Sequence, residues 1–491
     1  MRRLLIAAVI LVAALALLVV ILPDVLLKGT FLRGKLQKGP DDFFVDYASA
    51  SSPSPGVVHV RGLILRDRDG ATEWAFQAEE VRFRFSLLAI AARRLEIRDV
   101  EGKGLSFRAR SRPKPGEKKR DPKQLPSIPG FGPEPLPRVE ERVTKKPSPW
   151  TIHVAGIDLP LREVWVNHVQ WSGVGTVQGG FRLKPGQRAE IGPAVVQVED
   201  GILHDAGTTV ATATKGRIEG TFPSFAVKEY PGNEVFNIVH GRIQLGGKLA
   251  GFRFLADAFP GGRLRGGAGS AQVDLTLQKG QGRGTLNFDS NDIQVTARGN
   301  EIRGDLEGRL RLRDVEIGRK RAVLSGSRVE LKDVFVEGSP AKEPWQATLD
   351  FPEARYGSPP QLAARLEGTM SNARPLLALA AGVPEWAAKR LSKDPLRLTV
   401  RGTAGSGAFE LQEAKATAND LSIEGRFRRR QGQELGIFLV DTGLLNLGIA
   451  VGGAKPGVKV FGPKKWYREA VAEWDARPPD AASSLLKKGA G

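Results

Sequence analysis

The chain has 491 residues, of which 41% are hydrophobic and 26% charged, so it can build a large core or several modules. It has no cysteine, which excludes disulfides, thiolate nucleophiles and thiol-based metal sites. The net charge of +19 suits an acidic partner such as nucleic acid, anionic lipid headgroups or acidic glycans, although solubility alone would explain it equally well.

The first elements predict a membrane anchor over residues 1–23. Arg2 and Arg3 precede an uncharged stretch from Leu4 to Leu22, which is close to the ~20 residues needed to span a bilayer. The arginines favour a cytoplasmic N-terminus, with residues 24–491 on the other side. The alternative is a cleaved signal peptide, with small residues at Ala14 and Ala16. Either way the bulk of the chain leaves the cytoplasm, which argues against a nucleic-acid partner.

Residues 24–111 are predicted to form an N-terminal β segment. Apolar and polar residues alternate with a period of two, which places them on opposite faces of a strand. A short apolar segment over 86–94 (SLLAIAARR) favours one or two helical turns instead. The expected strands cover residues 57–65, 73–78, 81–85, 95–100 and 105–109.

Residues 112–149 interrupt this pattern. The segment is rich in proline and lysine, with RPKPGEKKRDPK near its start and TKKPSP near its end. Such a composition buries little surface and predicts a flexible loop or linker. Its basic run could also bind headgroups or acidic polymers.

Residues 150–463 are predicted to form an elongated, mainly β region. From Trp165 to Leu183 the chain alternates for nineteen residues, with an uncharged set at odd positions and a mostly polar set at even positions. The same alternation recurs at 273–277 and 306–312. Turn signals such as Lys279-Gly280 and residues 289–291 separate the strands.

Helical patterns are few in this region. Residues 373–393 (ARPLLALAAGVPEWAAKRLSK) predict a helical insert that Pro384 breaks or kinks. Strands are expected again over 396–402, 408–411, 421–427 and 435–440. The last segment, 464–491, is expected to contain an amphipathic helix over 465–475 (KWYREAVAEWD) and a flexible tail.

No motif for catalysis or cofactor binding stands out. The five histidines are scattered and have no partner at metal-ligand spacing. The glycines at 173, 175 and 179 lie in a strand pattern and not in a dinucleotide loop, and no P-loop occurs. We therefore expect no enzymatic activity, no cofactor and no metal.

Residues 57–109 resemble the AsmA-like superfamily, the bacterial relatives of bridge-like lipid transfer proteins. The strand VVHVRGLILRD is followed by WAFQAEEVRFRFSLLAIAARRLEIRDVEGKGLSF, which has the order of elements typical of that superfamily. The resemblance covers the first hundred residues well and the rest loosely. The positions that carry it are Ala78, Val81, Leu87, Leu88, Leu95, Ile97, Val100, Leu105 and Phe107.

The resemblance implies a long, curved antiparallel sheet shaped like a groove or gutter. It implies a protein anchored in the cell inner membrane by residues 4–22, with its bulk in the periplasm, that carries phospholipid acyl chains toward the outer membrane. The residue patterns point the same way, because a large apolar sheet face needs a cover and the predicted helices are few.

We therefore expect acyl chains to contact the apolar faces of the long strands. The alternative for these residues is an ordinary closed core. The candidate residues are Val169, Trp171, Val177, Phe181, Val273, Leu275, Leu277, Leu306, Leu310 and Leu312.

Two other functions remain open from the sequence. A periplasmic scaffold or assembly factor could hold an outer-membrane protein, or another periplasmic partner, through its edge strands. A glycan-binding or hydrolytic β-sandwich would need a pair of carboxylates in a cleft.

Overall fold

The computed structural model describes a mainly β protein. The described residues are 44–68, 71–114, 121–138, 149–230, 232–251, 262–297, 300–336, 344–357, 361–372, 394–405, 408–419, 421–430, 433–452 and 457–476. They contain 24 strands, whose pairings are antiparallel apart from two. The predicted fold class, mainly β with antiparallel pairing, is confirmed at this level. The predicted anchor (1–23) and the helical insert (373–393) lie outside the described residues.

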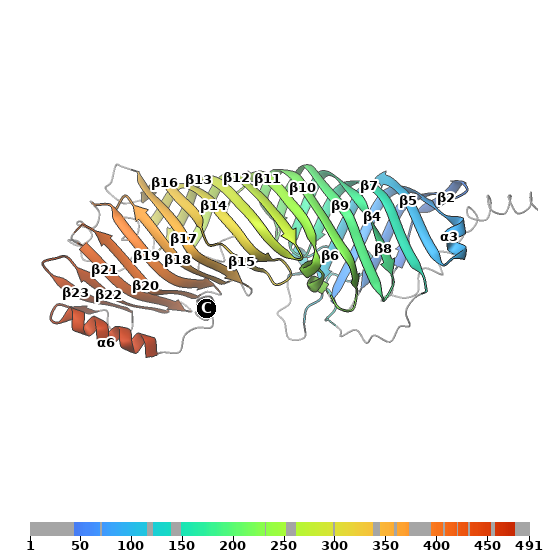
Figure 1. Cartoon of the computed structure of the whole chain (residues 1–491). Coiled ribbons are helices and arrows are strands. Elements are labelled where there is room, and N and C mark those ends of the chain that lie inside the picture. Colours follow the sequence, from blue (N-terminus) through green and yellow to red (C-terminus); the bar gives the residue numbers. More distant parts are fainter. Residues whose placement is uncertain are drawn as a thin grey trace, which may run out of the picture. The chain divides into compact units, whose positions relative to one another are not determined.

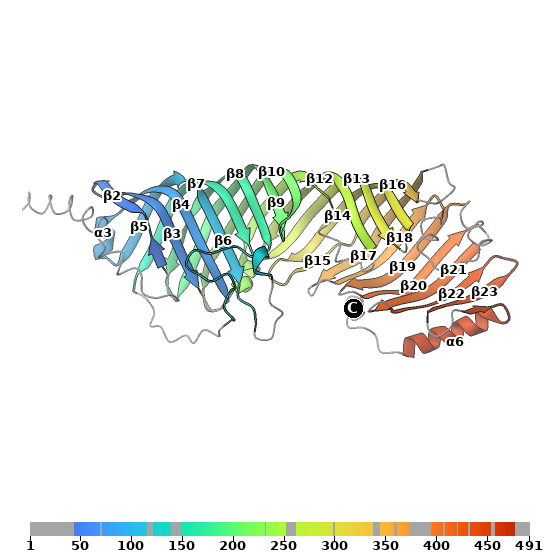
Figure 2. The same cartoon turned by 180° about the vertical axis from the view of Figure 1, so that it is seen from behind.

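The chain divides into two compact units, residues 1–245 and 246–491. This boundary falls inside the segment that the sequence pattern assigned to one elongated region. Figures 1 and 2 show the strands of each unit from opposite sides. The two units are described separately below.

Unit 1 is built from strands that pair mostly with their neighbours in sequence. β1 and β2 both pair with β3, β3 pairs with β4, and β7 to β10 follow one another as antiparallel neighbours. The strands are β1 (Phe44–Asp46), β2 (Ser49–Ser54), β3 (Val57–Arg68), β4 (Thr72–Phe85), β5 (Arg94–Lys103), β6 (Leu105–Ser111), β7 (Thr151–Val166), β8 (Val169–Lys184), β9 (Arg188–Asp205) and β10 (Thr208–Ala226), and β11 (His240–Leu249) reaches the boundary.

The segment 112–149 connects two parallel strands. β5 and β6 follow each other along one line, and each is antiparallel to β4 and parallel to β7. Parallel neighbours cannot be joined by a tight turn and need a crossover of a dozen or more residues. The proline-rich segment provides that crossover between Ser111 and Thr151.

The nineteen-residue alternation from Trp165 to Leu183 is not one strand. β7 ends at Val166 and β8 begins at Val169, with Val166 and Val169 directly opposite each other. Asn167 has a φ of 53°, which asparagine tolerates better than most residues. This turn exchanges the faces of odd and even positions, because Val166 lies opposite Val169 and Trp165 opposite Gln170, so the odd positions at the start of β8 share a face with the even positions at the end of β7.

Unit 2 is a succession of antiparallel neighbours from β12 to β24. β15 is short and bridges the ends of β14 and β17, while β16 pairs with both of those strands. The strands are β12 (Gly262–Gln278), β13 (Gln281–Ala297), β14 (Asn300–Glu316), β15 (Arg321–Val323), β16 (Ser327–Val336), β17 (Trp345–Gly357), β18 (Gln361–Met370), β19 (Leu396–Gly405), β20 (Ala408–Ala418), β21 (Leu421–Arg430), β22 (Gln433–Asp441), β23 (Asn446–Gly452) and β24 (Gly457–Lys459).

Of the two turn signals in this region, one is confirmed and one is wrong. Lys279-Gly280 forms the two-residue turn between β12 and β13. Residues 289–291, in contrast, lie inside β13. The register shifts just after them, between Ser290 and Ile293, and Asp292 has a φ of 52°. The polar cluster therefore produces a bulge, not a turn.

The described helices are short. α3 (Leu87–Ala91) lies within the predicted segment 86–94, α6 (Pro463–Ala476) contains the predicted helix 465–475, and the other two are the 3-10 turns η1 (Pro122–Gln124) and η2 (Gly232–Ile238). Ser86 caps α3 by accepting a hydrogen bond from the Ala89 amide. Within the described residues, no helix combines the length and apolar character that crossing a bilayer requires.

Glycine makes room for an aromatic ring in the sheet of unit 2. Gly308 lies opposite Phe288, and a Cβ at Gly308 would be 2.1 Å from the ring. We expect Gly308→Ala to lower the free energy of unfolding by about 1–3 kcal/mol, as overpacking does. Gly357→Ala is the control, since its Cβ would meet nothing within 4 Å. Urea denaturation measures both, and equal effects would contradict the assignment.

Candidate functional site

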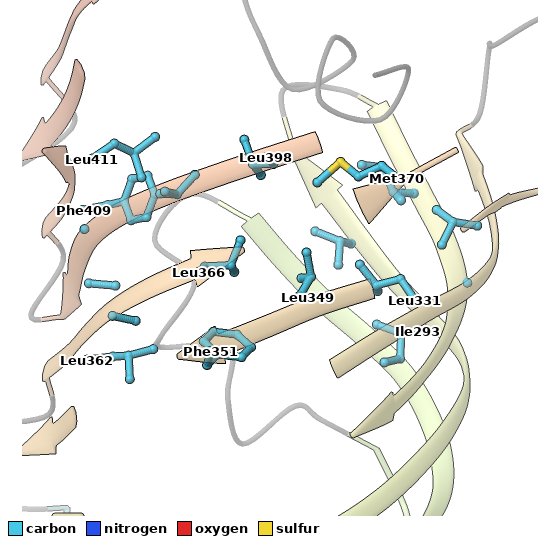
Figure 3. A pocket seen from close by; sticks show the side chains of 18 of the residues that line it. Ile293, Leu331, Leu349, Phe351, Leu362, Leu366, Met370, Leu398, Phe409 and Leu411 are labelled. Carbon is cyan, nitrogen blue, oxygen red and sulfur yellow. The ribbon is translucent and has the colours of Figure 1, made fainter. Parts of the chain in front are cut away.

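One face of unit 2 encloses an apolar cavity of about 470 Å³, which we call the unit 2 cavity. Strands β13, β14 and β16 to β20 contribute to it, and Figure 3 shows their side chains around the open space. Its lining residues are Ile293, Val295, Ile302, Gly304, Leu331, Val334, Trp345, Leu349, Phe351, Leu362, Ala364, Leu366, Met370, Leu398, Val400, Gly402, Thr403, Ala404, Phe409 and Leu411.

The unit 2 cavity is almost purely apolar. Nineteen of its twenty lining residues are apolar or glycine, and the other, Thr403, lies opposite Glu410 in the register of β19 and β20. The volume falls within the ~300–1,000 Å³ range of small-molecule sites. With no charged group and a single hydroxyl, that of Thr403, in its wall, the cavity can select a ligand mainly by apolar contact and shape.

Strand alternation explains this lining. In β18, Leu362, Ala364 and Leu366 line the cavity, while the residues between them, including Arg365, do not. Leu366 lies opposite Val400 of β19, so the two side chains share the face. Both are half-buried, as are most of the lining leucines, so solvent reaches them. The face is therefore an open, apolar groove wall at these positions.

A row of aliphatic side chains closes one end of this face. The row crosses neighbouring strands in register, with Ala347 opposite Met370, Met370 opposite Leu396, and Ala418 opposite Leu421. The buried residues of this row are each at most 8% exposed. Its buried members are Val334, Trp345, Ala347, Met370, Leu396, Ala418, Leu421, Val440 and Leu447.

The opposite face of unit 2 is charged. Arg328 binds Asp350 at 2.7 Å, Lys332 binds Glu307 at 2.6 Å and Lys415 binds Glu424 at 3.0 Å, each pair across neighbouring strands. Such exposed pairs contribute little to stability, typically below about 1 kcal/mol. These ion pairs keep this face hydrated, so the two faces of unit 2 differ in polarity, one charged and the other apolar.

Helix α6 covers part of the charged face and not the cavity. Arg428 of β21 binds the buried Glu410 carboxylate at 2.6 Å and lies 5.2 Å from the Trp474 ring of α6. Trp466 of α6 lies against Gly448 of β23, where a Cβ would approach the indole to 2.5 Å. Burial, and then the nearby Glu424 carboxylate, raise the pKa of the Tyr467 hydroxyl.

Unit 1 also has one apolar face. The buried residues Ala78, Val81 and Leu105 belong to a cluster that continues through β7, with partly buried Trp171, Val177 and Phe181 of β8 against it. The Trp171 indole donates a hydrogen bond to the Thr214 hydroxyl at 2.9 Å. It covers Gly201, where a Cβ would be 2.4 Å from the indole nitrogen. Glycine in this face therefore makes room for tryptophan.

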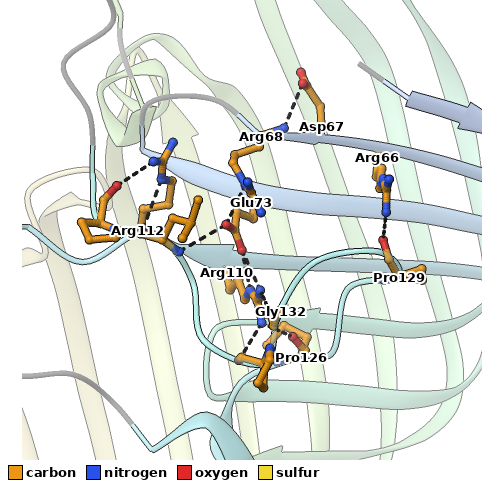
Figure 4. A network of polar contacts seen from close by, with 12 residues as sticks. Arg66, Asp67, Arg68, Glu73, Arg110, Arg112, Pro126, Pro129 and Gly132 are labelled. Carbon is orange, nitrogen blue, oxygen red and sulfur yellow. Dashed lines mark hydrogen bonds and ion pairs between the residues drawn. The ribbon is translucent and has the colours of Figure 1, made fainter. Parts of the chain in front are cut away.

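The other face of unit 1 carries residues 121–138, which we call the strap. The strap buries Leu125, Pro126 and Ile128 against the sheet, so the expectation that this segment buries little surface is wrong here. Arginines hold it through its carbonyl groups (Figure 4). Arg110 donates to the carbonyls of Pro126, Gly132 and Pro133, and Arg112 to those of Leu136 and Pro137.

A buried ion pair anchors the strap. Glu73 is fully buried, and its carboxylate lies 2.7 Å from the Arg110 guanidinium and 2.9 Å from that of Arg68. The Leu136 amide donates to the same carboxylate at 3.4 Å. The Phe131 ring lies under the guanidinium groups of Arg66 and Arg68. The proline-rich strap thus covers this face, and four of its proline carbonyls, those of Pro126, Pro129, Pro133 and Pro137, accept hydrogen bonds from arginines.

The structure places the predicted acyl-chain residues on both units. Trp171, Val177 and Phe181 contact the apolar cluster of unit 1, whereas Val169 is 39% exposed at the start of β8. In unit 2, Leu306 lies opposite Leu331 of the cavity wall. By strand register, Val273, Leu275, Leu277, Leu310 and Leu312 share that face, with Leu275 and Leu277 buried.

None of these ten residues lines the unit 2 cavity itself. The sequence reasoning followed the longest alternating runs, whereas fourteen of the twenty cavity residues lie in the shorter strands β17 to β20 and the other six in β13, β14 and β16. The signal was present in QLAARLEGTM (361–370) and LRLTV (396–400), where leucine, alanine and valine alternate with charged or polar residues. The alternation of residues does not predict that the apolar faces of these strands surround one cavity.

The most buried carboxylates of the described residues lie in ion pairs. Glu73 and Glu410 are both bound to arginine. Among the described residues, no group of three or more His, Asp or Glu side chains is placed to hold a metal ion.

No protein-family model matches the chain, and no curated protein or solved structure is significantly similar to it.

Proposed function

We propose that the protein binds phospholipid acyl chains along the apolar faces of its two units and carries them between membranes. The observation that carries the proposal is the unit 2 cavity, whose wall of nineteen apolar or glycine residues is open and half-buried. An acyl chain is a long apolar ligand without groups that need hydrogen bonds, so it matches such a wall.

The cellular setting belongs to the same proposal. An anchor over residues 4–22 would hold the chain in the inner membrane with its bulk in the periplasm, and the lipid would travel toward the outer membrane. A net charge of +19 suits anionic membrane surfaces. The resemblance of residues 57–109 to the AsmA-like superfamily supports this setting. In this proposal the protein is a carrier, not an enzyme, and requires no cofactor.

Native mass spectrometry of the full chain, released from mild detergent, tests the proposal. We expect masses of bound phospholipid that survive removal of the detergent. The matched control is Phe351→Asp, which places a carboxylate in the cavity wall and should lose the adducts. A wild-type spectrum without lipid, from protein shown to be folded, would contradict lipid carriage and favour the scaffold role.

A further inference from the structure

The end of unit 2 next to the start of α6 exposes an unusual group of large apolar side chains, which we call the tip. Phe461 is 95% exposed and Leu444 is 88% exposed, with Leu445, Val458 and Val460 each at least half exposed. Isolated exposed apolar residues are common, but a group of five at one place marks an interaction site.

The local hydrogen bonds hold these residues together. The β22–β23 turn is fixed by the Thr442 amide, which donates to the Leu445 carbonyl at 3.0 Å. Ile449 lies opposite Val458 and Gly448 opposite Lys459, so the register of β23 and β24 brings residues 460–461 back toward that turn. Lys464, at the start of α6, forms an ion pair at 2.8 Å with Asp441, at the end of β22, and so links residues 460–461 to the turn. This hydrogen-bonded pair lowers the pKa of the Asp441 carboxyl.

The tip combines its apolar residues with positive charge. Lys459, Lys464, Lys465 and Arg468 are exposed beside it. The nearby Asp441 is bound to Lys464, so the surface keeps a net positive charge. A group of exposed apolar side chains flanked by lysines matches a bilayer interface. The apolar side chains can enter the acyl region, and the lysine amines can contact the lipid phosphates.

We propose that the tip docks on the surface of an anionic phospholipid bilayer and inserts Phe461 and Leu444 into it. A protein partner would favour a flatter, broader patch with hydrogen-bonding groups among the apolar ones. The proposal goes beyond acyl-chain carriage, because insertion of the tip does not require lipid in the unit 2 cavity. Docking would bring this end of unit 2 to a membrane.

Spin labelling tests the docking directly, because the chain has no cysteine. A label at Val460→Cys, in full-length protein kept in phosphatidylcholine nanodiscs, is compared with one at Val174→Cys. Both valines are exposed, at 50% and 59%, and Val174 lies in β8 of unit 1. On adding phosphatidylglycerol vesicles, we expect the Val460 label alone to become accessible to oxygen and protected from a water-soluble nickel complex.

Substitutions distinguish the insertion of apolar side chains into the bilayer from the attraction of the lysines to anionic lipids. Phe461→Asp should abolish the protection, while Val174→Asp should leave it unchanged. Lys465→Glu should weaken vesicle binding by at least about fivefold, since each lysine near an anionic surface contributes a factor of that size. The effect of Lys465→Glu should vanish at high salt.

Three outcomes would overturn the proposal. One is unchanged accessibility at Val460 with vesicles. Another is protection that depends on protein concentration and not on vesicles, which would identify a second copy as the occupant. The third is equal protection with pure phosphatidylcholine vesicles. Retained docking by Val400→Asp protein that has lost its lipid adducts would support the tip independently of lipid carriage.

Discussion

Replacing Val400 by aspartate is expected to remove bound acyl chains from unit 2 while leaving its sheet folded. Val400 lines the unit 2 cavity opposite Leu366, and it is half-buried and not part of the buried aliphatic row. With the cavity empty, water can reach the new carboxylate, so folding should survive. With an acyl chain bound, the carboxylate would be desolvated at a cost of several kcal/mol. We expect lipid binding to fall more than about 100-fold.

Thr399→Asp is the matched control for this variant. Thr399 is the adjacent residue of β19, is exposed and does not line the cavity. It should retain both its lipid adducts in native mass spectrometry and its thermal unfolding temperature. Unfolding of the Val400 variant alone would favour a closed core. Retained lipid in a folded Val400 variant would show that acyl chains bind elsewhere or not at all.

Replacing Arg110 by alanine is expected to release the strap and destabilise unit 1 strongly. Arg110 is 1% exposed, binds Glu73 at 2.7 Å and donates to three strap carbonyls. Its removal leaves the fully buried Glu73 with fewer partners. Breaking one side of a buried ion pair typically costs about 3–5 kcal/mol. We expect a loss of that size in urea denaturation, together with faster proteolysis within residues 121–138.

Arg112→Ala provides the comparison, because Arg112 also donates to strap carbonyls but is only half-buried. Its loss should cost about 1 kcal/mol, the net value of ordinary hydrogen bonds. The double variant Glu73→Ala/Arg110→Ala should lose less than the sum of its single variants, since each single change leaves the other group unpaired. Similar losses for Arg110→Ala and Arg112→Ala would show that the buried pair does not anchor the strap.

The strap is the clearest case in which the composition of a segment led to a wrong expectation about its burial. Residues 112–149 are dense in proline and charge, so by themselves they cannot form a core. The buried Glu73 and Arg110 lie in β4 and β6, which both precede that segment in sequence, and only the pairing of these strands in the sheet places Arg110 where it donates to the strap carbonyls. Proline-rich chain can be ordered when another part of the protein provides its hydrogen-bond partners.

The hairpin at Asn167 is a second case, with a different cause. A period of two reports which face a side chain occupies within one strand, but a two-residue turn exchanges the faces of odd and even positions. The alternation from Trp165 to Leu183 therefore indicated two faces without revealing the turn, and Trp165 lies on the face of Gln170 and not on that of Trp171. The cavity in unit 2 was missed for a related reason, because alternation identifies an apolar face but carries no information on its curvature.

The sequence by itself determined the β class, most strand positions, the two short described helices and the apolar character of one strand face. These features depend on local propensity and on periodicity, which are written in neighbouring residues. Three features were decided only by the tertiary structure. One is the parallel crossover through the strap, and another is the placement of α6 on the charged face through Arg428 and Trp474. The third is that residues from seven strands line one cavity. Each of these depends on contacts between residues far apart in the chain, whose partners are fixed only when the sheet has formed.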